Sequence, residues 1–270
     1  MPVTLRLKRT PTVPLEAEVL SPDVMSGLSN DEIRSLTIYH GKRQLPISEF
    51  FDVEGERSED VVIHGAMQKV RWIGRGMSKG SITVHGTVGM HLGAYMTGGR
   101  IEVHGNASDW IGAEMKNGLI HVHGNAGGQI GAAYRGALAG MKNGTIIIDG
   151  SAGLEVGMRM RRGTIVIGGP VRDFAGLQMK GGTIILLSGA EIRTGAWMKR
   201  GTIISLKPVQ LMPTFAFANE MNPAFINICA KYLSQFGVCL PFSASDGTYR
   251  MYRGDLSVPG KGEIMIWQPI

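Results

Sequence analysis

The stretch IEVHGNASDWIGAEMKNG, residues 101–118, decides the fold because the chain repeats it in altered form. The preceding stretch, ITVHGTVGMHLGAYMTGG at residues 82–99, carries glycines and a methionine at matching places. The glycines that precede each apolar run recur at intervals of 19, 19, 26, 19, 19 and 19 residues: Gly80, Gly99, Gly118, Gly144, Gly163, Gly182 and Gly201. Seven methionines keep the same rhythm: Met77, Met96, Met115, Met141, Met160, Met179 and Met198. The chain is therefore built from internal repeats.

The repeat unit contains one short strand. It reads T-I-x-[IV]-x-G, and its alternation and β-branched residues are typical of strands. Nineteen residues are too few for a strand, a full helix and two turns, but they suit one coil of a solenoid. The sequence therefore predicts an all-β fold. We expect a right-handed parallel β-helix, a single-stranded solenoid of about 19 residues per coil, with short capping segments that contain helices.

Residues one period apart should lie above one another, about 4.8 Å apart. Ile82 and Ile101 would begin one inner ladder, and Val84 and Val103 a second. The methionines would form a third ladder, at a corner where a flexible side chain fills irregular space.

The repeats span residues 61–206, about eight coils. Residues 1–60 and 207–270 lack the repeat, and we expect them to cap the open ends of the stack and to pack on it. Helices are expected at 28–36 and 222–237.

Composition narrows the class of protein. Glycine is abundant, at 39 of 270 residues, and the net charge of +6 favours an acidic partner or ligand. Two cysteines do not make a disulfide framework, and neither a signal peptide nor a membrane span is evident. These features predict a reduced, cytoplasmic protein without a membrane partner.

The outward-facing positions of the strands change from polar to apolar along the stack. The apolar part needs cover, either from the chain's own tail or from another protein. A row of four histidines raises the question of a metal site: His64, His85, His104 and His123. A straight ladder points its rings in parallel and does not converge on an ion, so no metal site is predicted.

A strip of positive charge is expected at the turn after each methionine. Its members are Lys79, Lys116, Lys142, Arg161, Arg162, Lys180, Lys199 and Arg200. They are either solvated turn residues or a track for an anionic ligand or an acidic partner surface. Nucleic acid is not expected, because few aromatic residues are interleaved for base stacking.

One loop departs from the regular repeat. The interval of 26 residues holds a seven-residue insertion in GAAYRGALAGMKNG (131–144), with Tyr134 and Arg135. It is either a decorative loop or a contact to a partner protein. No known catalytic motif occurs, and the acidic residues are scattered over different coils, so no catalytic residue is predicted.

The coils at 93–150, including DWIGAEM (109–115) and AYRG (133–136), closely resemble the C subunit of formylmethanofuran dehydrogenase. They are also similar to the glycine-rich β-helix domain of glutamate synthase. The resemblance covers residues 75–206 and is looser in the flanks.

The resemblance implies a non-catalytic structural subunit of a complex in one-carbon metabolism. In methylotrophic bacteria this is the formyltransferase/hydrolase complex, which transfers a formyl group from formyl-tetrahydromethanopterin to a methanofuran-type coenzyme and releases formate. We favour that complex. The alternatives are the C subunit of an archaeal tungsten or molybdenum formylmethanofuran dehydrogenase and a glutamate-synthase-type spacer.

The implied assembly is a hetero-oligomer with amidohydrolase-like, dehydrogenase-like and formyltransferase subunits. The coenzyme of the complex carries glutamyl groups, which makes its tail a candidate ligand for the basic strip. A third hypothesis from the fold alone, an independent carbohydrate-active β-helix, is disfavoured by the scattered carboxylates.

Overall fold

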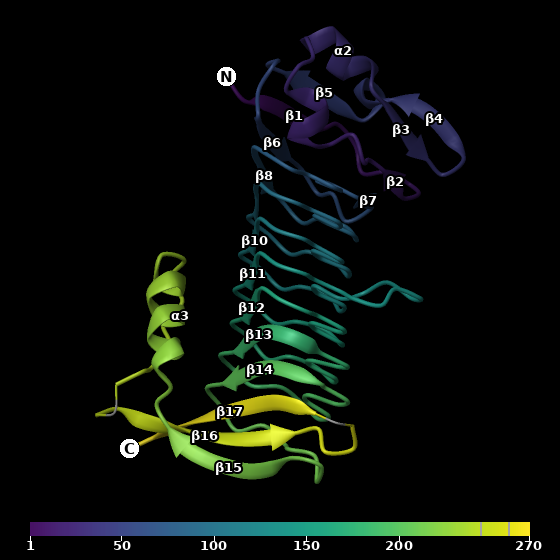
Figure 1. Ribbon diagram of the computed structural model, residues 1–270. Helices are drawn as coiled ribbons and strands as arrows, with labels where there is room; N and C mark the ends of the chain where they lie inside the picture. The colour runs from purple at the N-terminus through teal and green to yellow at the C-terminus, as the bar shows by residue number, and fades with distance from the viewer. Residues whose placement is uncertain (244, 259) are drawn as a thin grey trace.

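The computed structural model describes residues 1–243, 245–258 and 260–270. Its main feature is a stack of coils, each of which contributes one short strand (Figure 1). These strands are β6 (Asp60–His64), β8 (Ser81–His85), β9 (Arg100–Val103), β10 (Leu119–Val122), β11 (Thr145–Ile148), β12 (Thr164–Ile167), β13 (Lys180–Leu186) and β14 (Arg200–Ser205). Each pairs in parallel with the next, so the fold is mostly β, with a large and mostly parallel sheet.

The strand register follows the period of the sequence. Ile101 pairs with Ile82 on one side and with Ile120 on the other. Ile120 pairs with Ile146 across the longer interval, so the insertion leaves the register unchanged. A second line of parallel contacts joins Val88 to Ala107 on another side of the coils.

The interior is built from the predicted ladders. The isoleucines of the first ladder and the residues of the second are buried, as are all seven methionines of the repeat, each with 0% exposure. Such columns of branched and flexible apolar side chains remove a continuous strip of surface from water.

Non-glycine residues adopt a left-handed backbone at many turns, which the repeat alone did not suggest. One such column contains Trp72, His91, Trp110, Gln129, Glu155, Phe174 and Arg193. The other contains Tyr95, Glu114, Arg159, Gln178 and Trp197, each directly before a methionine of the repeat. Since a positive φ is costly for residues with a side chain, the stacked coils must hold these turns in place.

The N-terminal segment closes one end of the sheet. Strand β1 (Val3–Leu7) pairs in parallel with β6, and β5 (Phe51–Glu54) pairs antiparallel with β1. A separate four-stranded sheet has the order β4-β3-β2-β7, with β2 (Leu15–Glu16), β3 (Thr37–His40), β4 (Arg43–Pro46) and β7 (Val70–Arg71). The helical turns here are α1 (Pro22–Met25), α2 (Asn30–Ser35) and η1 (Ile47–Glu49).

Helix α2 lies within the range 28–36 that was predicted to be helical. Ser29 is the N-cap, and its side chain and that of Glu32 form a reciprocal capping box.

The C-terminal segment continues the sheet at the other end. Strand β17 (Lys261–Pro269) pairs in parallel with β14, and β16 (Gly247–Gly254) and β15 (Ala216–Met221) follow antiparallel. The full order is β15-β16-β17-β14-β13-β12-β11-β10-β9-β8-β6-β1-β5.

Helix α3 (Ala224–Ser234) stands beside the stack in Figure 1. It covers the apolar outer face of the later coils: Ile147 and Ile185 of the sheet form one buried cluster with Ile226 and Leu233 of α3 and with Trp267 of β17. None of the helices in the described part of the chain has the length and apolar character needed to cross a membrane.

Candidate functional site

A column of cationic residues follows the buried methionines. Each member donates its backbone N–H to the methionine carbonyl of the preceding coil, at 2.7–2.8 Å. The members are Lys116, Lys142, Arg161, Lys180 and Lys199. Because the methionine side chains are fixed in the core, the adjoining residues are forced outward at one edge. The predicted strip therefore consists of two neighbouring columns, and the residues just listed form the first. The second contains the residues that directly precede a glycine: Lys79, Arg162 and Arg200.

Five residues of the strip line one groove of about 700 Å³, together with Gly181: Lys142, Arg161, Arg162, Lys180 and Arg200. An adjoining groove of about 470 Å³ is lined by Leu138, Arg159, Gln178, Lys180, Trp197, Lys199 and Val258. Lys180 lines both. Six of the eight predicted residues thus lie around one basic groove, as we name these two adjoining grooves.

The positive charges in the basic groove lack carboxylates among the described residues that line it. Burial, followed by the charges of Arg161, Arg159 and Lys199, lowers the pKa of the Lys180 ammonium. A bound anion would offset the like charges that contribute to this lowered pKa.

Two predicted residues lie outside the groove. Lys79 forms an ion pair with Glu59 at 2.6 Å, and the hydrogen bond and charge of Glu59 raise the pKa of its ammonium. Lys116 belongs to the same column as Lys142 but does not line the groove.

The insertion loop lies beside the basic groove and is tied to it. Arg159 donates from Nη1 to the carbonyl of Ala137 at 2.8 Å, and Lys180 donates from Nζ to the carbonyl of Leu138 at 2.5 Å. Leu138 is 77% exposed and Trp197 49% exposed, so exposed apolar side chains line the groove beside the cations. Arg159 was not predicted from the sequence, because the column directly before the methionines holds no other cation.

Tyr134 does not line the groove and belongs to an aromatic cluster. Its hydroxyl lies 2.8 Å from Nδ1 of His91, and its ring stacks on Trp110 at 4.8 Å. Burial, then the charge of Arg71, lowers the pKa of His91 to about 4, so this imidazole is neutral near pH 7. Arg135 beside it is exposed. The partner contact predicted for Tyr134 and Arg135 stays a prediction.

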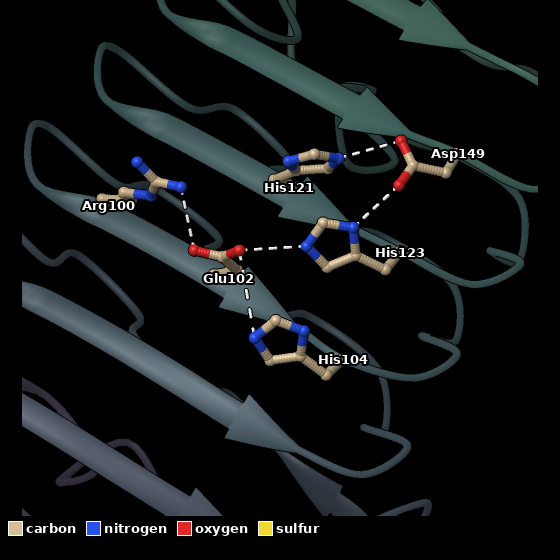
Figure 2. A network of polar contacts seen from close by, with 6 residues as sticks. All are labelled: Arg100, Glu102, His104, His121, His123 and Asp149. Carbon is tan, nitrogen blue, oxygen red and sulfur yellow. Dashed lines mark hydrogen bonds and ion pairs between the residues drawn. The ribbon is translucent and has the colours of Figure 1, made fainter. Parts of the chain in front are cut away.

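The outer histidine row stacks as the period predicts. The rings of His64, His85, His104 and His123 follow one another at centroid distances of 4.8–4.9 Å. At its end, His123 lies close to two carboxylates, Glu102 and Asp149, and to His121 (Figure 2). Donor atoms that could hold a metal ion gather there, which was not predicted from the sequence.

Comparisons with known proteins agree with this architecture. A family model described as the GXGXG motif matches residues 51–230. The chain is 46% identical over 83 residues to the C subunit of molybdenum-containing formylmethanofuran dehydrogenase 1 of Methanothermobacter marburgensis, which covers 30% of this chain and 21% of that protein. It is 39% identical over 97 residues to the C subunit of tungsten-containing formylmethanofuran dehydrogenase 2 of Methanothermobacter thermautotrophicus, covering 34% of this chain and 36% of that protein. The matched part thus spans well under half the length of these relatives.

A solved structure matches nearly the whole chain. It is the formyltransferase/hydrolase complex (FhcABCD) from Methylorubrum extorquens in complex with methylofuran. One of its chains is 34% identical, with a TM-score of 0.90, and the match covers 97% of this chain and 98% of that one. The chain belongs to the GXGXG motif family, as a homologue of the formylmethanofuran dehydrogenase C subunit.

Proposed function

We propose that this chain is the non-catalytic structural subunit of a formyltransferase/hydrolase complex of one-carbon metabolism. In that reaction a formyl group passes from formyl-tetrahydromethanopterin to a methanofuran-type coenzyme and is released as formate. The observation that carries the proposal is the match over 97% of this chain to one component of such a complex. Partners of amidohydrolase-like, dehydrogenase-like and formyltransferase type would hold the chemistry, in a cytoplasmic hetero-oligomer.

The scaffold in this proposal is a right-handed parallel β-helix. Residues 61–206 form its coils, residues 1–60 the N-terminal cap, and residues 207–270 a helix and tail packed on the stack. A stack of paired coils gives a stiff body that can hold larger subunits at fixed distances.

The basic groove is proposed to guide the anionic tail of the coenzyme. Several glutamyl carboxylates on one flexible tail match several cations on consecutive coils, since both recur at short and regular steps. The crystallised relative holds methylofuran, which supports a coenzyme-binding role for the assembly. Exposed lysines and arginines would act mainly on association rate and on salt dependence.

The C subunit of an archaeal formylmethanofuran dehydrogenase is the second candidate. The identity of 46% to the molybdenum enzyme's subunit favours it, but that match covers only 30% of this chain. The partners decide between the two: a formyltransferase subunit favours the first candidate, and a molybdenum or tungsten subunit the second.

The test is affinity purification of the tagged chain from native extract, with mass spectrometry of the partners. Recovery of a formyltransferase subunit and formyl-transfer activity in the same fraction is expected. A chain that is recovered alone, or that shows formyl-transfer activity without partners, contradicts the proposal.

A second experiment tests the groove within the assembled complex. We expect the double variant Arg161→Gln/Lys180→Gln to raise the KM for the glutamylated coenzyme about three- to tenfold at low salt. Lys79→Gln/Lys116→Gln is the matched control, because it removes the same charge outside the groove. Equal KM values for both variants would contradict a guiding role while leaving the scaffold role intact.

A further inference from the structure

Strands β10 and β11 bring two histidines and an aspartate together on the outer face of the sheet (Figure 2). His121 lies within β10, and His123 follows its last residue. Residues two apart on a strand face the same side, so both rings project outward. Asp149 follows the end of β11 on the next coil, after the insertion.

The two imidazoles converge on one carboxylate. Nε2 of His121 lies 2.8 Å from one oxygen of Asp149, and Nδ1 of His123 lies 2.8 Å from the other. Two imidazole nitrogens and a carboxylate are a common ligand set for divalent transition metals. We propose that His121, His123 and Asp149 form a binding site for a divalent transition-metal ion, with Zn²⁺ as the best fit.

The two nitrogen–oxygen contacts need only a small change to admit the ion. With Zn–N and Zn–O distances of about 2.0–2.2 Å and tetrahedral angles, nitrogen and oxygen ligands lie about 3.3 Å apart. The nitrogens and carboxylate oxygens are now 2.8 Å apart, so they must separate by about half an ångström.

A second carboxylate orients the central histidine. Glu102 accepts from Nε2 of His123 at 3.0 Å, and Arg100 holds the other oxygen of Glu102 at 2.8 Å. A proton on Nε2 leaves the lone pair of Nδ1 free for the metal. This carboxylate–histidine–metal arrangement is the usual way in which proteins fix the tautomer and raise the basicity of a ligating histidine.

Burial makes the site partly rigid and partly open. His121 is 6% exposed, so its ring is held by its surroundings. The side chain of Asp149 is 41% exposed, so solvent can supply a further ligand. Because metal ligands must be deprotonated, binding of the ion displaces the protons of the hydrogen bonds within this cluster.

A neighbouring group competes with this assignment. Glu102, His104 and His123 also offer three donor atoms within reach of one another. The rings of His104 and His123 are stacked 4.9 Å apart and nearly parallel, at 12°. Nε2 of His104 lies 3.9 Å from the same Glu102 oxygen that Nε2 of His123 approaches to 3.0 Å. This second group is therefore looser than the first, in which both nitrogen–oxygen distances are 2.8 Å.

The test uses the full chain without a histidine tag. Equilibrium dialysis against Zn²⁺ with elemental analysis gives stoichiometry and affinity, and Co²⁺ absorption in the visible region reports the ligand set. We expect one ion per chain and a low-coordinate Co²⁺ spectrum. Mg²⁺ in excess should not compete, because imidazole ligands select against it.

Variants separate the two groups of donors. Asp149→Asn and His123→Ala should weaken Zn²⁺ binding by more than about 100-fold, and Glu102→Gln by about 10- to 100-fold, as for other orienting carboxylates. His104→Gln should bind like the unaltered chain. His85→Gln is a further control from the same row, without a carboxylate in contact among the described residues.

Two results would overturn the assignment. One is Zn²⁺ binding that is absent at micromolar concentration, or unchanged in Asp149→Asn. The other is a loss in His104→Gln as large as the loss in Asp149→Asn, which would place the ion in the competing group. Circular dichroism and thermal unfolding of Asp149→Asn, whose side chain is partly exposed, separate a lost ligand from a lost fold.

Discussion

Two glycines test why the coils are so rich in this residue. Gly98 has an ordinary φ, but a Cβ built on it would lie 2.3 Å from the carbonyl oxygen of Ser78 on the preceding coil. Gly76 has φ +67° and nothing within 4 Å of the same position. Alanine at Gly98 therefore tests close approach between coils, and alanine at Gly76 tests backbone strain.

The two alanine substitutions should lower the free energy of unfolding by different amounts. A left-handed alanine costs about 1–2 kcal/mol, and the stiffer unfolded chain returns about 0.4–1 kcal/mol, so Gly76→Ala should cost about 1 kcal/mol. At Gly98 the Cβ is about 1 Å short of the ordinary C···O contact distance of about 3.3 Å. Because hydrogen bonds hold the coils on both sides, we expect overpacking and weakened bonds to cost about 3–4 kcal/mol.

Thermal unfolding followed by circular dichroism measures both variants. At about 2–4 °C per kcal/mol, Gly76→Ala should lower the Tm by about 3 °C and Gly98→Ala by about 10 °C. Hydrogen exchange should locate the damage in Gly98→Ala at the amides of Thr97 and Arg100, which bond to the preceding coil. If the Tm values of Gly76→Ala and Gly98→Ala lay within about 2 °C of each other, the close approach of the coils at Gly98 would not cost more than the positive φ at Gly76, and the reasoning would be refuted.

Three further outcomes follow from the packing and the titrating groups. Ile185→Ala, in the cluster under α3, should lower the free energy of unfolding by about 2–4 kcal/mol, whereas Ile192→Ala at a 42% exposed position should change it by less than about 0.5 kcal/mol in urea titrations. The pKa of His91 is lowered to about 4, so the free energy of unfolding should fall as pH drops from about 6.5 toward 4. Because the ring is partly exposed, we expect a loss of about 1–2 kcal/mol, and His91→Phe should abolish this pH dependence. The pKa of His123 is raised, so its contribution is complete below about 6.5 and is lost as pH rises through the folded-state value; a His123→Gln chain whose stability keeps the same slope above pH 6.5 would contradict this.

The repeat predicted the register because each coil carries the same marks. The pairing of Ile120 with Ile146 follows from counting glycines across the insertion, and no structural knowledge is needed for it. The strand partners of segments that occur only once could not be predicted in this way. The chain's end was expected as a helix and tail, yet β15, β16 and β17 add three strands to the sheet. An alternating stretch such as 261–269 has no second copy to fix its partner.

The turn columns with positive φ show a second limit. Trp110 and Glu114 adopt left-handed conformations on either side of Gly112, which does the same. Propensity favours glycine at such places, but stacking between coils overrides it. The sequence period shows which residues share a turn column. It does not give their φ angles, because these depend on how the neighbouring coils constrain the turn.

The basic groove shows which features of a site the sequence period predicts and which it does not. The period predicted Lys142, Arg161 and Lys180 in one column, and the backbone N–H of each bonds to a methionine carbonyl of the preceding coil. It could not show that the insertion folds beside that column, because the contacts of Arg159 and Lys180 with the loop depend on side-chain conformation.

In this stack of coils, we expect groups that could bind a ligand where a column changes its residue type. Identical neighbours in a ladder give parallel rings or like charges, and such repetition neither converges on an ion nor pairs an acid with a base. Within the row of histidines, the residue type changes at the step from His123 to Asp149, where a carboxylate contacts the last imidazole. The adjoining row changes at the same step, from His121 to the buried Ile147. The insertion falls in that interval too. Three departures from the repeat therefore coincide at one coil boundary. In a stack of repeated coils, a functional site should be sought at such departures more than in the repeat itself.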